Sequence, residues 1–204
     1  MALRRVVLLR HGRTVWNHER RMQGRLDPEL DDVGRAQAAA VGPAMRRFDP
    51  VRLLASDQRR AWATAEAAAS ATGLVVRSEP RLRETGLGEW EGLTGDEVEA
   101  GWPGGIDVWR SDPRFAPPGG ESRCDVAERV RPVVGDLESE LADPPDTPDT
   151  ALLVAHGGAI VALTASLLEW PVAVWPTLHP LPNCHWAVLE RRDSWRLLAW
   201  GAGV

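Results

Sequence analysis

Residues 8–14 read Leu-Leu-Arg-His-Gly-Arg-Thr, and they directly follow the apolar pair Val6 and Val7. An apolar run that ends at a turn residue is typical of a buried strand in a parallel sheet. Such a strand would deliver Arg10 and His11 to the carboxyl edge of the sheet, where open α/β folds bind their ligands. Imidazole can act as a nucleophile, and a guanidinium group recognises phosphate through planar, bidentate hydrogen bonds. The stretch therefore predicts a histidine that accepts a phosphoryl group.

A second apolar run ends in the same way, because residues 152–158 read Leu-Leu-Val-Ala-His-Gly-Gly. A single histidine at the end of a strand is more often a structural residue than a functional one, so the repetition carries the information. Two strands that each present His-Gly at one sheet edge can bring their histidines into one pocket. We therefore expect His11 and His156 to share a site.

Composition narrows the class of protein. The chain has 204 residues, of which 44% are apolar and 26% charged, which is typical of one globular domain with a substantial core. A net charge of −5 argues against nucleic acid as a partner. The sequence contains no apolar stretch that approaches the roughly 18 residues of a membrane span, and its start leaves no room for a signal peptide. We expect a cytoplasmic protein that binds neither nucleic acid nor membrane.

The basic and sulfur-containing residues exclude several chemistries. All 24 basic residues are arginine, so the sequence lacks the lysine that a Schiff-base enzyme or a P-loop requires. Cys124 and Cys184 lack the spacing of metal ligands and are too few for a disulfide framework. We expect no metal and no cofactor.

Apolar runs alternate with helix-like stretches, which favours an α/β architecture. We expect strands at 6–9, 51–55, 74–77 and 151–155, helices at 31–48, 58–71, 122–142 and 158–168, and a terminal hairpin made of 184–190 and 195–200. Pro132 should kink or shorten its helix, and 143–149 should form a surface loop. Residues 84–121 contain nine glycines and four prolines and predict loops with one short helix. The domain organisation that we expect is a single domain, 1–204, with a loop-rich cap segment around 84–121.

Two further clusters suit phosphate chemistry. Arg59 and Arg60 fall in the first turn of the expected helix at 58–71, which Ser56-Asp57 can cap, and a phosphate would meet backbone N–H groups there. Spacing alone does not choose between these arginines, and a solvated helix start is the alternative. The stretch from Glu84 to Glu91 supplies carboxylates, one of which can protonate a leaving oxygen and later activate water. Taken separately, each carboxylate is better explained as a solvated loop charge.

Taken in order, the motifs resemble the histidine phosphatase superfamily, also called phosphoglycerate-mutase-like. They are Leu-Arg-His-Gly at 9–12, Asn17, Gln23-Gly24, Ser-Asp-x-x-Arg-Ala-x-x-Thr-Ala at 56–65, Leu-Arg-Glu-x-x-x-Gly-x-Trp-Glu-Gly at 82–92 and Ala-His-Gly-Gly at 155–158. The resemblance covers nearly the whole chain. It implies a three-layer α/β/α fold with a mostly parallel sheet and helices on both faces.

The resemblance also implies a role for each matching residue. His11 would become phosphohistidine, while Arg10, Arg60 and His156 would bind the phosphoryl oxygens. Glu84 would protonate the leaving alcohol and then deprotonate water. The substrate side would include Asn17, Gln23 and Gly24. No metal is required, since arginine and histidine stabilise the oxygen charge.

Within the superfamily, a phosphatase with water as the phosphoryl acceptor is favoured over a mutase, because Glu84 is followed by Thr-Gly-Leu-Gly instead of the string typical of mutases. The alternatives are a 2,3-bisphosphoglycerate-dependent phosphoglycerate mutase, an α-ribazole or broad-specificity phosphatase, and a phosphate-ester-binding protein without turnover. Several stretches resemble the glucosyl-3-phosphoglycerate phosphatases, including Pro-Gly-Gly-Glu-Ser-Arg at 118–123. That resemblance makes Glu121 and Ser122 candidates for substrate binding, and a structural helix start is the equal alternative. The expected partner is a small-molecule phosphate ester, with a homodimer left open.

Overall fold

The computed structural model describes residues 3–141 and 149–204, so most of the surface loop expected at 143–149 lies outside the described residues. In the described part of the chain, six strands form one sheet in the order β3-β2-β4-β1-β5-β6. The first four in this order are mutually parallel, and β5 and β6 form the terminal antiparallel hairpin. The strands are β1 (Leu3–Arg10), β2 (Pro50–Ala55), β3 (Val76–Ser78), β4 (Asp149–Ala155), β5 (Trp186–Arg191) and β6 (Trp195–Ala202). The expected mostly parallel sheet is confirmed.

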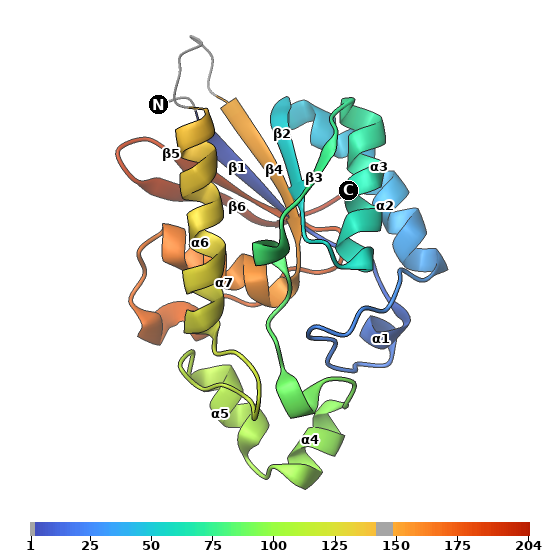
Figure 1. The fold of residues 1–204 in the computed structure, drawn as a ribbon, viewed down its shortest axis with the longest axis vertical. Helices are drawn as coiled ribbons and strands as arrows, with labels where there is room; N and C mark the ends of the chain where they lie inside the picture. Colours follow the sequence, from blue (N-terminus) through green and yellow to red (C-terminus); the bar gives the residue numbers. More distant parts are fainter. Residues whose placement is uncertain (1–2, 142–148) are drawn as a thin grey trace.

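Helices cover both faces of this sheet (Figure 1). Helices α2 (Asp32–Met45) and α3 (Arg59–Thr72) pack on one face, and α6 (Arg123–Glu140) and α7 (Gly157–Leu167) pack on the other. The remaining elements are short. The α-helices among them are α1 (Val15–His18), α4 (Gly95–Gly101) and α5 (Gly105–Ser111). The 3₁₀ helices are η1 (Arg46–Phe48), η2 (Pro80–Leu82), η3 (Gly88–Trp90) and η4 (Val172–Thr177). The three-layer α/β/α fold is confirmed.

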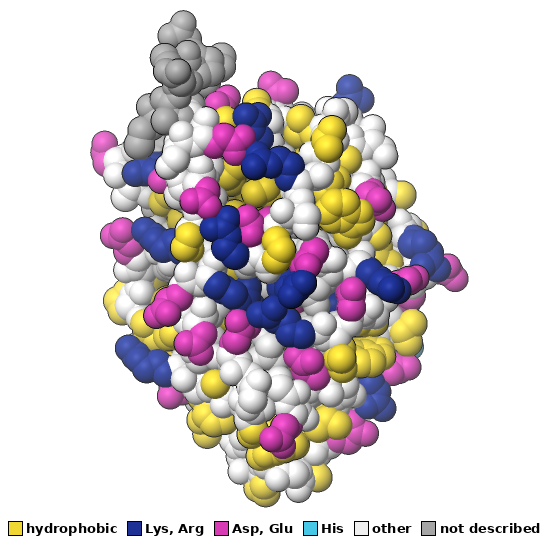
Figure 2. Space-filling model, viewed as in Figure 1, with side chains coloured by type: hydrophobic (Ala, Val, Ile, Leu, Met, Phe, Trp, Pro, Cys, Tyr) yellow, Lys and Arg dark blue, Asp and Glu magenta, His cyan; other side chains and the backbone are white. Residues whose placement is uncertain are grey.

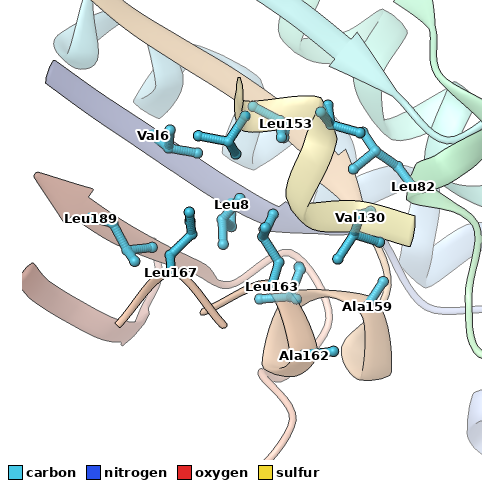
Figure 3. Close-up of a cluster of buried hydrophobic side chains, with 14 of the residues drawn as sticks. Val6, Leu8, Leu82, Val130, Leu153, Ala159, Ala162, Leu163, Leu167 and Leu189 are labelled. Carbon is cyan, nitrogen blue, oxygen red and sulfur yellow. The ribbon is translucent and has the colours of Figure 1, made fainter. Parts of the chain in front are cut away.

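The alternation of side chains along β1 explains the layers. Val6 and Leu8 join the core under α6 and α7, whereas Val7 and Leu9 join the core under α2 and α3. Figure 3 shows Leu8 beside Leu163 of α7 in the first of these cores, with Val6 further along β1. A strand that is buried on both faces reads as a continuous apolar run, which is why the sequence revealed it.

Pro132 does not end its helix, contrary to one of the expected outcomes. Helix α6 runs from Arg123 to Glu140 with Pro132 inside it. Proline removes one hydrogen bond of the helical ladder, but Val130, Val133 and Leu137 are buried on both sides of it and hold the helix on the sheet. Tertiary packing therefore outweighs the local cost.

The segment 84–121 has more structure than its glycine content predicts. It contains two short helices, α4 and α5, where one was expected. Thr94 and Glu97 form a reciprocal capping box that begins α4. The fully buried ring of Trp90 organises a small core of its own, in contact with Trp102, Trp109 and Phe115. This cap lies at one end of the molecule, beyond the sheet (Figure 1).

Charged side chains of both signs are interspersed on the face shown in Figure 2. Many of them pair across elements: Glu140 of α6, for example, binds both Arg52 of β2 and Arg77 of β3. In the described residues, none of the helices is both long and apolar enough to cross a membrane.

Candidate active site

The two histidines predicted from the sequence meet at the carboxyl edge of the sheet. Strands β1 and β4 are parallel neighbours with Arg10 opposite Ala155, so the residues that follow, His11 and His156, emerge side by side. Their ring centroids are 5.1 Å apart, and their exposed fractions are 2% and 0%. The structure thus brings together the two imidazoles that the repeated His-Gly motif suggested.

His11 has the protonation state of a nucleophile. Its Nδ1 atom lies 2.7 Å from the Gly12 carbonyl oxygen, which can accept a hydrogen bond but not donate one. Burial lowers the pKa of His11 well below its usual value, and the positive charges of Arg60 and Arg10 lower it further. A neutral ring that donates through Nδ1 keeps its lone pair on Nε2.

The ring of His156 is held by a hydrogen bond to Ser56. The Ser56 Oγ accepts a hydrogen bond from the Gln58 N–H at 3.3 Å and lies 2.9 Å from the His156 Nε2. The hydroxyl can donate to Nε2 while it accepts from Gln58, and in that tautomer the ring proton lies on Nδ1. Burial, followed by the charge of Arg60, lowers the pKa of His156 well below its usual value. Within the described residues Nδ1 has no partner, so an N–H donor is available for an anion.

Arg60, rather than Arg59, belongs to the site. Arg60 is fully buried in the first turn of α3 and donates to the Leu26 and Gly24 carbonyls at 2.8 and 3.0 Å. Arg59 points to solvent and pairs with Glu29. Burial lowers the pKa of Arg60 to about 10, so the guanidinium remains charged at neutral pH.

The expectation that Ser56-Asp57 caps α3 is wrong. Gln58 occupies the cap position without a side-chain cap bond. Ser56 contacts His156 instead, and Asp57 pairs with Arg83. The side chains of Ser56 and Asp57 therefore contact the site and the residue that precedes Glu84.

Arg10 ends β1 beside His11, and its Nη1 donates to the Leu181 carbonyl. Its Nε is buried and has no hydrogen-bond partner in the described residues, and the same holds for the Nε of Arg60. Buried N–H donors normally find acceptors. Two such donors beside two imidazoles indicate a site for an anion.

Glu84 is fixed against the first turn of α7. Its two carboxylate oxygens accept hydrogen bonds from the N–H groups of Gly158 and Ala159, each at 3.1 Å, and from that of Thr85 at 2.8 Å. A Cβ atom on Gly158 would lie 2.6 Å from Glu84 Oε1, so this close approach requires glycine. Because His156 is the residue that precedes α7, Glu84 and His156 are held by the same helix start.

Arg10, His11, Arg60 and Glu84 line one cavity of about 200 Å³. The predicted residues Asn17, Gln23 and Gly24 line it too, and the buried Gln23 Oε1 has no partner in the described residues. His156 is not among the lining residues and reaches the site through its contact with His11. A larger hollow of about 870 Å³ lies between α6 and the β5–β6 turn and includes neither histidine.

Glu121 and Ser122, which the sequence left open between substrate binding and structure, do not line this cavity. Glu121 accepts hydrogen bonds from Arg25, Arg129 and the Gly86 N–H; burial raises its pKa, but these bonds outweigh burial and lower it to about 2. Ser122 caps α6 by accepting the Asp125 N–H. The contacts of both residues support the structural alternative.

Sequence reasoning missed three polar residues of the cavity wall, Arg21, Thr85 and Arg123. Thr85 directly follows the predicted Glu84. Arg123 is the first residue of α6, where a positive charge opposes the helix dipole, and this unfavourable placement was the available signal. In the described residues no group of three or more histidine, cysteine or acidic side chains is arranged to hold a metal ion.

This arrangement suits phosphoryl transfer. Such a reaction depends on positioning and on stabilising negative charge on the phosphoryl oxygens. The cavity supplies a neutral imidazole, two buried guanidinium groups and an oriented carboxyl group. In a phosphoryl transfer, such groups can serve as nucleophile, anion binders and proton donor.

Comparisons with known proteins agree with this chemistry. The model of the Histidine phosphatase superfamily (branch 1) matches residues 6–203. A glucosyl-3-phosphoglycerate phosphatase from Mycobacterium tuberculosis is 48% identical over 100% of this chain and 97% of its own length. A solved mycobacterial glucosyl-3-phosphoglycerate phosphatase with VO3 superposes with a TM-score of 0.92 at 48% identity, over 98% of this chain and 100% of the other. A probable phosphoglycerate mutase from Erwinia tasmaniensis is 34% identical over 96% of this chain and 89% of its own length.

Proposed function

Because the chain belongs to the histidine phosphatase superfamily, we propose that it hydrolyses a phosphate monoester through a phosphohistidine at His11, with glucosyl-3-phosphoglycerate as its substrate. The observation that carries the mechanism is the neutral, buried His11 ring beside Arg10, Arg60 and Glu84 in one cavity. The substrate is suggested by the relative from M. tuberculosis, whose name states that activity.

In the first step, the His11 Nε2 lone pair forms a bond to phosphorus while the bond from phosphorus to the ester oxygen breaks. The protonated Glu84 carboxyl gives its proton to the departing alkoxide, so that a neutral alcohol leaves. Arg10, Arg60 and the Nδ1–H of His156 hold the phosphoryl oxygens, whose charge is spread in the transition state.

In the second step, the Glu84 carboxylate takes a proton from a water molecule as the water oxygen attacks phosphorus. The bond to His11 Nε2 breaks, and inorganic phosphate leaves. Both carboxylate oxygens already accept backbone N–H bonds from the start of α7, which supports the same orientation of Glu84 in both steps. The site returns to its starting protonation state.

The test of this function is phosphate release from glucosyl-3-phosphoglycerate in the presence of EDTA. We expect turnover that survives chelation and is lost in His11→Ala. Complete dependence on a divalent metal, or full activity of His11→Ala, would contradict the mechanism. Hydrolysis of p-nitrophenyl phosphate without hydrolysis of glucosyl-3-phosphoglycerate would be consistent with the mechanism but would refute the proposed substrate.

A mutase would instead interconvert 2- and 3-phosphoglycerate with stimulation by 2,3-bisphosphoglycerate, and a binding protein without turnover would show neither reaction. We expect no mutase pattern, because Thr-Gly-Leu-Gly follows Glu84 instead of the string typical of mutases. We also expect turnover, because His11, Glu84 and His156 are all present. A cytoplasmic location and a homodimer stay predictions, which fractionation and sedimentation would test.

A further inference from the structure

Arg123 lines the cavity but has no role in the proposed phosphoryl transfer. It lies at the start of α6 and lines the same cavity as His11 and Glu84. Its guanidinium carbon lies 5.4 Å from the centre of the Trp109 ring, in a cation–π arrangement, and its Nη1 donates to the Arg110 carbonyl at 3.2 Å. These two contacts fix the side chain in the cavity wall on the cap side.

The charge of Arg123 lacks a counterion. Among the residues that the structure describes, no carboxylate forms an ion pair with it, whereas Arg21 in the same wall pairs with Glu19 and Glu97. Burial lowers the pKa of Arg123 without an acidic neighbour that raises it. A partly buried guanidinium with no anion is costly, because the protein returns little of the hydration energy that the charge loses.

The position in α6 adds to this cost. Arg123 is the first residue of an 18-residue helix whose N-terminus is capped by Ser122. Unpaired N–H groups make that end of the helix positive, so acidic residues are favoured there and a cation is disfavoured. An anion in the cavity beside Arg123 would relieve both the missing counterion and the unfavourable helix position.

The phosphoryl group does not need Arg123, since Arg10, Arg60 and His156 already offer unpaired nitrogens at the sheet edge. The volume of the cavity is about 200 Å³. In a cavity of this size, a second anionic group of the substrate has to lie within a few bonds of the phosphate. A carboxylate fits a guanidinium through two parallel hydrogen bonds.

We propose that Arg123 binds a carboxylate of the substrate while the phosphoryl group lies against His11, so that the enzyme selects phosphate monoesters that carry a nearby carboxylate. This inference rests on the proposed function of the same cavity. It assigns to the first residue of α6 a role in choosing the substrate, distinct from the groups that perform phosphoryl transfer.

The experiment compares glucosyl-3-phosphoglycerate with its carboxyl methyl ester, which keeps the phosphate and removes the negative charge of the carboxylate. In the wild type, we expect kcat/KM to be about 10–100 times higher for the free acid, as for loss of a charge-assisted hydrogen bond. Arg123→Met should remove this preference, mainly by raising KM for the acid, and Arg123→Lys should restore part of it. Arg110→Met is the matched control, because Arg110 is an exposed neighbour outside the cavity wall.

Each alternative result is decisive. Equal losses for the acid and the methyl ester in Arg123→Met would mean that Arg123 only supports the cap, and the proposal would fall. No preference for the acid in the wild type would also overturn it. In either case, p-nitrophenyl phosphate tests the phosphatase mechanism separately. If the wild type hydrolyses it and His11→Ala does not, the proposed mechanism stands even though the role of Arg123 is refuted.

Discussion

The N–H of Gly12 donates a hydrogen bond to the Thr64 Oγ1 over 3.0 Å, and the same hydroxyl donates to the Arg60 carbonyl over 2.8 Å. One buried threonine of α3 thereby links the loop that carries His11 to the helical turn that carries Arg60. Gly12 itself cannot be larger, because a Cβ atom there would lie 2.4 Å from the Gly34 carbonyl oxygen. The proposed nucleophile and a proposed anion-binding arginine are positioned through a single side chain.

Thr64→Val should therefore lower both the stability of the fold and the rate of catalysis. The change keeps the shape but leaves the Gly12 N–H buried without an acceptor, which costs about 1–3 kcal/mol in the free energy of unfolding. Displacement of His11 should also lower kcat for p-nitrophenyl phosphate. Thr72→Val is the control, because Thr72 makes the same backbone bond, to Ala68, without a link to the site. Equal effects of the two substitutions on kcat would refute this role of Thr64.

The buried histidines should make stability depend on pH. The pKa values of His11 and His156 are lowered in the folded state, so the unfolded chain binds more protons as the pH falls below its ordinary histidine pKa near 6.5. The stabilisation is complete above about pH 6.5. It is lost progressively as the pH falls from there toward the lowered pKa values of the folded state. Two such groups give a slope of at most about 2.7 kcal/mol per pH unit.

Urea unfolding between about pH 5 and 7 measures this slope, above the range where carboxylates dominate. His156→Gln removes one of the two titrating rings and should roughly halve the slope, whatever it does to the stability at pH 7. A slope that is the same in the wild type and the variant would mean that His156 is not held neutral by the fold.

Glu84→Gln tests the proton donor. The amide cannot protonate the leaving alkoxide, so kcat for an alkyl phosphate should fall by about 10²–10⁴. The loss should be much smaller for p-nitrophenyl phosphate, whose leaving group needs little protonation. Glu89→Gln is the matched control, because Glu89 is an exposed carboxylate of the same loop. Losses of equal size for both substrates would remove Glu84 from the acid role.

Glu121→Gln separates a structural role from substrate binding. The Glu121 carboxylate holds the guanidinium groups of Arg25 and Arg129 and the Gly86 N–H, and Arg129 in turn donates to the Glu84 carbonyl at 2.9 Å. The neutral amide should lower the free energy of unfolding by about 1–3 kcal/mol. The exposed Glu128, changed in the same way, should have no such effect. A large rise in KM at unchanged stability would favour substrate binding instead.

The sequence predicted those parts of the site that follow from local pattern and chain direction. Apolar runs on β1 and β4 are readable because both faces of these strands are buried, and parallel neighbours must bring His11 and His156 to one edge. The choice of Arg60 over Arg59 was reached from the family motif and not from spacing, since it depends on which side of α3 faces the sheet.

The remaining parts of the site depend on contacts between distant segments. Substrate binding and a structural role were equal alternatives for Glu121 until its partners Arg25 and Arg129 were known, and Arg25 is 96 residues away. Arg123 was missed because its importance comes from a missing counterion, which requires knowledge of every neighbour. Nothing local in Ser56 predicts that it contacts His156.

The most direct test of the account is to trap the intermediate. The wild type is mixed with p-nitrophenyl phosphate, quenched within the first turnover and analysed by intact-mass spectrometry with fragmentation. We expect one added phosphoryl group per chain on His11, stable to alkali, labile to acid, and missing in His11→Ala. Phosphorylation of another residue, or full turnover by His11→Ala, would contradict it.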